Sequence, residues 1–537
     1  MNISYNWLKD YLQFDLTPKE TADILTHIGL EAESLEEVQT VKGGMEGLVI
    51  GEVITCIEHP NSDHLHLTTV NIDNGSEPLN IVCGAPNVAA GQKVVVATIG
   101  TTLYSGDEQF KIKSSSIRRE ESIGMICSES EIGLSDNHDG IIVLPQDAPV
   151  GTLAKEYYNI KSDWVIGIDI TPNRVDAASH YGVARDLAAW LKQAGKPFKL
   201  TKPSVDDFAV DKKDGGIEVI VENTEACPRY SGLTIRGVTV KDSPDWLRDK
   251  LLAIGQRPIN NIVDITNYIL HETGHPMHAF DAAYITSDEV VVRTMPDKTK
   301  FTTLDEEERE LSDKDLMICN TDEGMCIAGV FGGMHSGVTN DTKDIFLESA
   351  YFNPSWVRKT ARRHGLNTDS SFRFERGADP NNTVYVLKRA AMLVKELAGG
   401  EIEGDIRDIY PAPIECKKVT LSYDKTTKLI GKEIPADEIK SILHSLETEI
   451  ISESETDITF NIPTYRVDVT RDVDVIEDIL RIYGYNNIEI SDSLKANLSY
   501  QTPTDRKNNL QTLISEQLTA NGFSEIMNNS LTKKSYY

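Results

Sequence analysis

The sequence predicts a multidomain α+β protein that contains a small β-barrel, and three observations support this prediction. The chain has 537 residues, of which 40% are hydrophobic, enough for about three to five packed domains. Residues 43–153 are rich in short β-branched runs separated by Gly, Pro, Asn and Asp, a pattern typical of a small barrel. Helical patterns flank this region on both sides, and composition shifts at 192–216, 410–415 and 491–507 indicate linkers.

Composition and charge restrict the class of protein. There are 54 Lys and Arg against 84 Asp and Glu, a net charge of −30, so any polyanion must bind at a local patch and not over the whole surface. The 7 cysteines form no C-x-x-C pair, which indicates free thiols in a reducing compartment. The sequence shows neither a signal-peptide pattern nor a long apolar run, so we expect a soluble cytoplasmic protein.

The segments around the barrel suggest helical modules and a mixed domain. The front flank, TPKETADILTHIGLEAES, and a later segment, IPADEIKSILHSLETEII, share Pro, an acidic pair, Ile-Leu and an acidic-apolar end, so we expect a weak internal repeat. Residues 217–400 mix strand patterns such as DEVVVRTM with helical patterns such as TVYVLKRAAMLVKELAGG. We therefore expect an α+β domain there.

One short motif raises a zinc hypothesis. HETGH at 271–275 has the order H-E-x-x-H, which binds zinc when both imidazoles share a helix face. Here Gly274 stands where a helix C-terminal glycine belongs, and Pro276 pushes His275 out of the α region. We therefore reject a zinc peptidase on geometry and expect solvent-facing or hydrogen-bonded histidines.

The barrel region carries one concentration of positive charge. The segment KIKSSSIRR holds Lys111 and Lys113 on one strand face, with Arg118 and Arg119 just beyond. Residues 40–155 otherwise hold more acidic than basic side chains. Two interpretations stay open, a contact to phosphate and a solvated strand edge.

A second charged cluster lies near residue 475. Asp474, Glu477 and Asp478 fall at i, i+3 and i+4 on an expected helix, beneath Asp468 on the preceding strand or loop. Such carboxylates repel each other unless water, a hard cation such as Mg²⁺, or a neighbouring arginine offsets their charge. Arg471 and Arg481 stand at helical spacing for the last of these solutions.

Several blocks in order together resemble the beta subunit of bacterial phenylalanine-tRNA ligase over essentially the whole chain. The blocks are HPNSDHLHLTTV, IVCGAPNVAAGQKV, GMICSESEIGL, TPNRVDAASHYGVARDLAA, RPINNIVDITNYIL, GHPMHAFD, IAGVFGG, TDSSFRFERGADP and RIYGYNNI. The resemblance implies an alpha2beta2 heterotetramer in the cytoplasm. In this assembly the alpha subunit is expected to bind most of the ATP molecule and to make phenylalanyl-adenylate. The beta subunit is expected to bind tRNA(Phe) and to remove wrongly attached tyrosine.

The resemblance also implies a division into domains. An oligonucleotide-binding-fold β-barrel that binds tRNA (40–153) is inserted in a helical, winged-helix-like N-terminal α+β domain (1–38 with 154–200). An α+β editing domain follows (206–402), then a small winged-helix-like domain with a magnesium site (410–490) and the start of a synthetase-like catalytic module (500–537). Family chains are longer than this one, and Arg119 stands where the family usually has glycine.

Site residues follow from the same resemblance. Glu348 accepts the tyrosine phenol, with the Gly332 N–H as a second partner in the glycine run that includes Gly329. His278 orients the attacking water or the ribose hydroxyl, and Thr368 and Ser370 line the pocket. The carboxylates of Asp468, Asp474, Glu477 and Asp478 hold Mg²⁺ near the alpha subunit.

Each of these residues also has a structural interpretation, a capping or ion-paired carboxylate for Glu348 and a hydrogen-bonded core histidine for His278. A rival function stays open as well, a non-catalytic tRNA-binding or assembly protein that keeps the fold without editing. Retention of both Glu348 and His278 favours the enzyme, because a scaffold needs neither.

Overall fold

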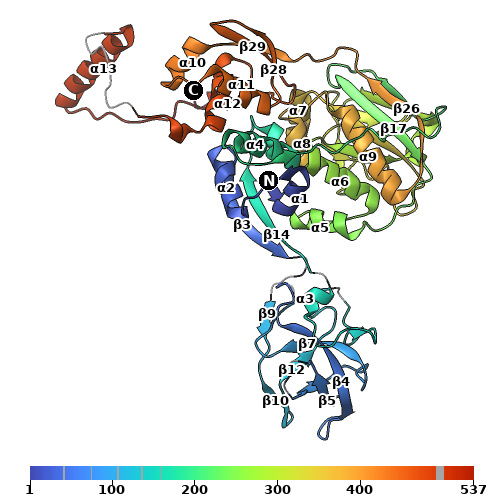
Figure 1. The fold of residues 1–537 in the computed structure, drawn as a ribbon. Helices are drawn as coiled ribbons and strands as arrows, with labels where there is room; N and C mark the ends of the chain where they lie inside the picture. The colour runs from blue at the N-terminus through green and yellow to red at the C-terminus, as the bar shows by residue number, and fades with distance from the viewer. Residues whose placement is uncertain are drawn as a thin grey trace. The chain divides into compact units, whose positions relative to one another are not determined.

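The computed structural model describes residues 1–39, 41, 43–73, 75, 77–105, 108–134, 137–158, 160–490 and 501–537. The chain divides into two compact units, Met1–Asn487 and Ile488–Tyr537. Figure 1 shows the helices and strands of both. No helix in the described ranges combines the length and the apolar composition that crossing a bilayer requires.

The N-terminal elements and those that follow the barrel form one sheet. β14 (Ser162–Asp169) pairs antiparallel with β1 (Asn2–Ser4) on one side and with β3 (Glu31–Gln39) on the other. The other elements of this region are α1 (Tyr5–Tyr11), β2 (Leu12–Gln13), α2 (Pro18–His27), α3 (Ala154–Tyr157), the 3-10 helix η1 (Val175–Ala177), α4 (His180–Gln193) and β15 (Lys199–Leu200). The segments before and after the barrel are therefore joined by backbone hydrogen bonds.

Local sequence explains how these helices start. The Ser4 hydroxyl accepts from the Trp7 N–H at the start of α1. Thr17 and Glu20 form a reciprocal capping box at α2, and Pro18 occupies the first turn, where a missing N–H is tolerated. α2 and the later α11 (Ala436–Ser445) are both 10 residues long and each precedes a strand, so the two copies of the weak sequence repeat adopt the same helix-strand order.

Residues 48–153 form a nearly closed antiparallel sheet. Its strands run in the order β12-β7-β4-β5-β6, and β13 also pairs with β7. Ile123, next to β12, donates its N–H to the Asn80 carbonyl of β6 at 2.9 Å, which brings the two ends of the sheet together. The strands are β4 (Leu48–Glu58), β5 (His66–Asn71), β6 (Leu79–Cys83), β7 (Lys93–Thr98), β8 (Thr102–Ser105), β9 (Glu108–Lys111), β10 (Ser115–Ile117), β11 (Glu120–Ser122), β12 (Gly124–Ile126) and β13 (Val143–Leu144).

Residues 217–409 build two sheets around one hydrophobic core. A mixed sheet has the order β16-β19-β22-β23-β24, and an antiparallel sheet has the order β18-β25-β17-β26. Their strands are β16 (Glu218–Val221), β17 (Arg229–Arg236), β18 (Met277–Asp281), β19 (Glu289–Thr294), β22 (Leu316–Cys319), β23 (Gly324–Ile327), β24 (Phe331–Gly332), β25 (Asp344–Tyr351) and β26 (Glu401–Ile409), with the hairpin β20 (Lys300–Thr302) and β21 (Glu308–Glu310) apart. Buried side chains of both sheets belong to one cluster, so the sheets pack face to face.

Helices cover the antiparallel sheet of this domain. α6 and α9 contact each other and the strands β18, β25 and β17, and Figure 1 shows them side by side. The helices of the domain are α5 (Asp245–Ala253), α6 (Asn261–Thr273), η2 (Ala282–Tyr284), η3 (Thr286–Asp288), α7 (Pro354–His364), α8 (Asp369–Phe374) and α9 (Thr383–Ala398). The α+β expectation for this part of the chain is confirmed.

The last part of the first unit is a small α+β module with a sheet of order β27-β29-β28. Its elements are β27 (Lys417–Ser422), α10 (Tyr423–Ile430), α11, β28 (Glu449–Glu453), β29 (Asp457–Ile462), α12 (Asp472–Tyr483) and η4 (Tyr485–Asn487). The second unit holds α13 (Pro503–Ala520) and η5 (Lys534–Tyr536). α13 starts at a Thr502–Asp505 capping box and buries none of its residues.

Candidate functional site

The helix that carries the HETGH motif ends as its sequence predicts. α6 starts at an Asn260 cap and stops at Gly274, whose φ of 76° is in the left-handed region that glycine tolerates. His271 therefore lies inside the helix and His275 lies beyond it. Glu272 accepts the Tyr11 hydroxyl at 2.9 Å and pairs with the Arg389 Nε at 3.2 Å. The motif thus ties α6 to α1 and α9.

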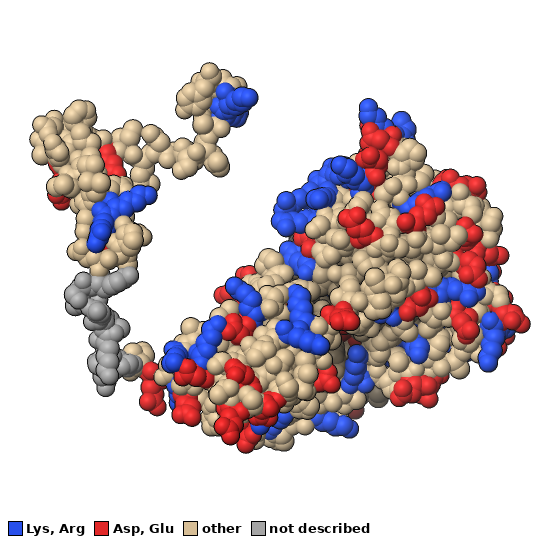
Figure 2. All heavy atoms as spheres, turned by 90° about the horizontal axis from the view of Figure 1, so that it is seen from above, with Lys and Arg blue, Asp and Glu red and all other residues tan. Residues whose placement is uncertain are grey.

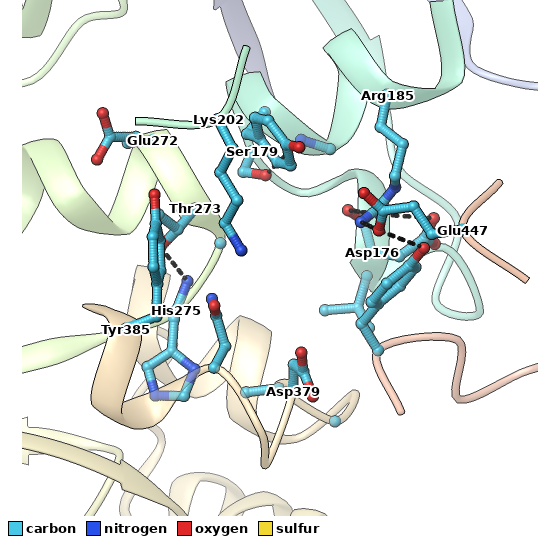
Figure 3. Close-up of a pocket in the computed structure, with 18 of the residues that line it drawn as sticks. Asp176, Ser179, Arg185, Lys202, Glu272, Thr273, His275, Asp379, Tyr385 and Glu447 are labelled. Carbon is cyan, nitrogen blue, oxygen red and sulfur yellow. Dashed lines mark hydrogen bonds and ion pairs between the residues drawn. The ribbon is translucent and has the colours of Figure 1, made fainter. Parts of the chain in front are cut away.

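A cavity of about 160 Å³ opens beside this helix end. Figure 3 shows Lys202 reaching into it, while the ring of His275 points away from the Lys202 amine. The Lys202 ammonium lies 4.0 Å from the centre of the Tyr385 ring, and burial lowers its pKa. Other walls come from the start of α4, the end of α6 and the start of α9. The cavity is a junction between three segments whose acidic side chains already have partners, as Glu272 does.

The residues expected to recognise and hydrolyse an ester meet on neighbouring strands. His278 of β18 stands directly opposite Glu348 of β25 in the antiparallel register, so both side chains lie on one face of the sheet. Gly232 of β17 is the partner of Glu348 on its other side. A Cβ at Gly332 of β24 would lie 3.3 Å from Cε1 of His278, so this glycine lets the second sheet approach the imidazole closely. The three segments predicted from sequence therefore converge.

A buried tyrosine holds the Glu348 carboxylate. The Tyr230 hydroxyl donates to Oε2 of Glu348 at 2.8 Å. Tyr230 is fully buried and Glu348 is 5% exposed. In the described part of the chain no hydrogen-bond partner is seen for Oε1 of Glu348. One oxygen of the carboxylate is thus fixed, and the other can accept a hydrogen bond from a ligand.

Burial shifts the pKa values of Glu348 and His278 in opposite directions. Burial raises the pKa of Glu348 to about 7, and the Tyr230 hydrogen bond opposes this rise. Burial lowers the pKa of His278 to about 4, so the imidazole is neutral at pH 7. A neutral imidazole can orient a water or a hydroxyl through its lone pair. The pair therefore supplies one acceptor for a substrate hydroxyl and one positioning group.

Thr368 and Gly329 lie where α8 meets the turn between β23 and β24. The Thr368 hydroxyl accepts from the Ser371 N–H as the cap of α8 and donates to the Val330 carbonyl at 2.9 Å. Gly329 has a φ of 68°, and a Cβ there would come within 2.8 Å of Phe352 and 3.0 Å of Phe374. Ser370 is half-buried on the first turn of α8. Thr368 thus links α8 to the turn that contains Gly329. Gly329 contributes its left-handed backbone and the absence of a side chain, which lets Phe352 and Phe374 pack close to the turn.

The expected tRNA-binding side chains are exposed on two short hairpins, β8-β9 and β10-β11, that lie outside the main sheet of this region. Lys111 ends β9, and Lys113 follows on the same side with buried Ile112 between them. Arg118 and Arg119 form the two-residue turn between β10 and β11, with φ values of 48° and 79°. The Arg118 Nη1 donates to the Asn61 carbonyl at 2.9 Å, while the four cations stay exposed. Arg119 therefore keeps the left-handed backbone that glycine adopts more easily.

Three of the four carboxylates expected to hold magnesium, Asp468, Asp474 and Asp478, pair with arginines. Asp478 is buried and accepts from Arg466 at 3.0 Å and from Arg481 Nε at 2.7 Å. Asp474 accepts the Arg471 N–H at 2.8 Å and the Arg471 Nη2 at 2.8 Å, which closes the start of α12. Arg471 and Arg481 thus neutralise the acidic face of α12. Pairing with these arginines is the alternative to Mg²⁺ that helical spacing indicated.

Asp468 also pairs with Arg466, at 3.2 Å, and Glu477 is exposed. In the ranges that the structure describes, no group of three or more His, Cys, Asp or Glu side chains is arranged to hold a metal ion. The four carboxylates in this arrangement do not fit a magnesium ion, because a cation would have to displace arginines. No step below depends on a metal.

Comparison with known proteins places this geometry in a family. Three domain families match: the tRNA binding domain (tRNA_bind) over 48–153, the B3/4 domain over 226–399 and the tRNA synthetase B5 domain over 419–485. The chain is 66% identical over 537 residues, all of its length, to the phenylalanine-tRNA ligase beta subunit of Bacteroides fragilis strain YCH46, and it covers 65% of that protein. The chain belongs to the phenylalanine-tRNA ligase beta-subunit family.

More distant members of the family show the same coverage. The beta subunit of Porphyromonas gingivalis strain W83 is 59% identical over 538 residues, and that of Geobacter metallireducens is 44% identical over 527 residues. These matches cover 100% and 98% of this chain, and 65% and 64% of the relatives. The chain thus spans a little under two thirds of the length of the family members that it matches. The His278–Glu348 site lies in the B3/4 match, and the arginine-paired carboxylates lie in the B5 match.

Sequence reasoning missed Tyr230 and the arginine network. Tyr230 lies 118 residues before Glu348, in a strand whose alternation signals only burial. Arg481 also reaches Asp186 of α4, with its Nη1 2.9 Å from Oδ2, and Arg174 binds the same carboxylate. A buried arginine within an apolar helical pattern was the available signal, since arginine is rarely buried without a carboxylate partner.

Proposed function

We propose that this chain is the tRNA-binding and editing part of a phenylalanine-tRNA ligase beta subunit, and that it hydrolyses tyrosyl-tRNA(Phe). The observation that carries the proposal is the Glu348 carboxylate, which has one oxygen fixed by Tyr230 and the other available inside a buried site. A phenol hydroxyl satisfies that acceptor, while phenylalanine leaves it unpaired. The site therefore favours tyrosine over phenylalanine.

Within this proposal each residue has a distinct role. Glu348 reads the phenol, with the Gly332 N–H as a second partner. His278 orients the attacking water or the ribose hydroxyl beside the ester. The Gly329 turn, Thr368 and Ser370 shape the pocket, and Lys111, Lys113, Arg118 and Arg119 contact tRNA phosphates.

The hydrolysis needs no redox or covalent cofactor. Water adds to the carbonyl carbon of the tyrosyl ester, and the bond from that carbon to the ribose oxygen breaks. The ribose oxygen takes a proton as it leaves, which gives free tyrosine and tRNA(Phe). The neutral His278 imidazole holds the attacking water through its lone pair, so this chain contributes orientation more than basicity.

The remaining activities are proposed for the whole enzyme. We propose an alpha2beta2 assembly in the cytoplasm. ATP is bound mainly by the alpha subunit, which forms the adenylate, and Mg²⁺ is the metal of the complex. Because Asp468, Asp474 and Asp478 pair with arginines and Glu477 is exposed, this chain alone is expected to bind Mg²⁺ weakly. Domain roles follow the ranges 40–153 for tRNA binding, 206–402 for editing and 410–490 for the small module.

Single-turnover deacylation tests the editing proposal. Tyrosyl-tRNA(Phe) and phenylalanyl-tRNA(Phe) are each mixed with excess chain, with and without alpha subunit. Glu348→Ala is expected to slow tyrosyl release and to reduce the preference over phenylalanyl by roughly 1–3 kcal/mol. His278→Ala is expected to slow hydrolysis while keeping the preference. Equal slowing of both substrates by Glu348→Ala would make Glu348 structural, and no deacylation by the wild-type chain would favour the non-catalytic binding protein.

A further inference from the structure

The outer face of α7 carries positive charge that no carboxylate neutralises. Arg358, Lys359 and Arg362 are exposed on this helix. Within the ranges that the structure describes, none of the three has an ion-pair partner within 4.0 Å. The helix itself, PSWVRKTARRH, contains no acidic residue. In a chain of net charge −30, this face is therefore a local positive patch.

Helix stability explains only part of this charge. Cations in the last turn interact favourably with the helix dipole, which accounts for Arg362 and Arg363. Arg363 is already used inside the domain, since it pairs with the buried Asp315, which also accepts from Thr360 at 2.9 Å and contacts His364 at 2.8 Å. Arg358 and Lys359 lie in the middle of α7, where the dipole effect has faded.

The inner face of the same helix packs against the turn that leads into Gly332, the glycine beside His278. A Cβ at Gly329 would lie 3.3 Å from Val357 of α7, so the helix rests against the glycine turn. α7 follows directly after β25, which carries Glu348, and leads into Thr368, which bonds to the Val330 carbonyl. An α-helix with its side chains is about 10–12 Å wide, so the cations lie within roughly that distance of the turn. In Figure 2, Lys and Arg side chains gather over the position that α7 occupies in Figure 1.

We infer that Arg358, Lys359 and Arg362 of α7 bind phosphates of the single-stranded acceptor end of tRNA and hold its ester in the editing pocket. This inference rests on the proposed function, because the ester substrate brings its own backbone phosphates to the pocket. Lys and Arg contacts to phosphate fix register without reading sequence. Such contacts suit an enzyme that must present one terminal ester to a buried acceptor. The face is thus a positioning surface, separate from the residues that read the side chain.

The test compares two matched triple variants of the full chain. Arg358→Gln, Lys359→Gln and Arg362→Gln together remove the cations of α7. Lys213→Gln, Lys241→Gln and Lys343→Gln remove three exposed lysines from other elements of the same domain as a control. Both variants change the net charge by three, so a general electrostatic effect appears in both. Circular dichroism and thermal melting confirm that each variant is folded.

Two measurements separate this inference from the editing proposal. The first is binding of uncharged tRNA(Phe) as a function of salt, with intact tRNA and with tRNA trimmed of its single-stranded 3′ end. Each phosphate contact to a single strand contributes about 0.7 to the slope of log affinity against log salt, so the α7 variant is expected to lose about 2 from that slope with intact tRNA only. The second is deacylation of tyrosyl-tRNA(Phe), where KM is expected to rise roughly tenfold while kcat stays near wild type.

The outcomes are distinguishable. If the wild-type chain binds tRNA with the α7-dependent slope but deacylates nothing, the editing proposal fails and the phosphate contact stands. If deacylation is present but the α7 variant matches the control in slope and KM, the inference is overturned while editing stands. An equal loss with intact and trimmed tRNA would also overturn it, because the contact would lie away from the acceptor end. No binding by the wild-type chain overturns it as well.

Discussion

Glu348→Gln is expected to stabilise the protein more at high pH than at low pH. Burial raises the pKa of Glu348 from 4.5 to about 7, so the folded state holds a proton that the unfolded state has lost. For an acid with a raised folded-state pKa, the stability is fully present below pH 4.5 and is lost as the pH rises through about 7. Glutamine keeps the shape and an oxygen that can accept from Tyr230, but it does not ionise.

The magnitude follows from the two pKa values. With roughly 1.4 kcal/mol per pKa unit, ionisation of Glu348 lowers the free energy of unfolding by about 1 kcal/mol at pH 5.5 and by about 3 kcal/mol at pH 8.5. The advantage of Glu348→Gln over wild type should therefore grow by about 2 kcal/mol across this window. In the folded state the groups around Glu348 do not titrate within this window, because burial lowers the pKa of His278 to about 4 and raises the pKa of Cys227, Cys326 and Tyr230 well above their ordinary values. Their titration in the unfolded state is the same in both proteins and cancels in the difference.

The assay is urea unfolding of both proteins at pH 5.5 and pH 8.5, followed by near-ultraviolet circular dichroism. The quantity compared is the difference between variant and wild type, so titrations elsewhere in the chain cancel. The same variant should lose tyrosyl-tRNA(Phe) discrimination, because a neutral amide is a weaker acceptor than a carboxylate. A difference that does not change with pH would refute the reasoning, since it would mean that Glu348 titrates alike in the folded and unfolded states.

Three further changes probe the contacts that long-range packing creates. Tyr230→Phe removes the hydrogen bond that lowers the pKa of Glu348, so the pH midpoint of tyrosyl-tRNA(Phe) deacylation should move upward, and an unchanged midpoint would contradict the contact. Arg119→Gly should stabilise the barrel by roughly 0.5–1 kcal/mol in thermal melting, because glycine adopts a φ of 79° without strain. The control Arg119→Gln removes the charge but keeps the backbone strain, so it should give no gain in stability. Arg481→Ala should cost about 3–5 kcal/mol of stability in urea, because Asp186 and Asp478 keep only Arg174 and Arg466 and the buried cluster loses one positive charge. Adding Asp478→Asn should partly rescue this loss, and additive effects of the two changes would show that they do not interact.

Local chemistry predicted much of the fold. The end of α6 follows from Gly274 and Pro276, because one favours the left-handed region and the other forbids the α region to His275. The nearly closed sheet at 48–153 follows from alternating strands and turn residues. Asp474, Glu477 and Asp478 do share α12, as their spacing required. These features depend on interactions between residues close in sequence.

The rest depends on residues far apart in the chain. Spacing placed three carboxylates on one helix face, but it could not show that Arg466 binds Asp478 or that Arg481 spans 295 residues to reach Asp186. Once these arginines are in place, the charge that made magnesium attractive on sequence grounds is neutralised within the chain. Helical spacing indicated Arg471 and Arg481 as partners of these acids, and only the packing adds Arg466 and the link to Asp186.

The same reasoning applies to the candidate editing site, where the decisive residue carries no motif. A buried carboxylate with two free oxygens would bind water and would not distinguish phenol from phenyl strongly. Tyr230 occupies one oxygen of Glu348 with a phenol of its own, which leaves a single acceptor of defined direction. The β17-β25 register fixes this arrangement, because Tyr230 lies two residues before Gly232, the partner of Glu348, and so reaches that carboxylate diagonally. Under the proposed function, selectivity for one hydroxyl arises from the sheet that holds the carboxylate, and its cost is the stability lost when Glu348 ionises.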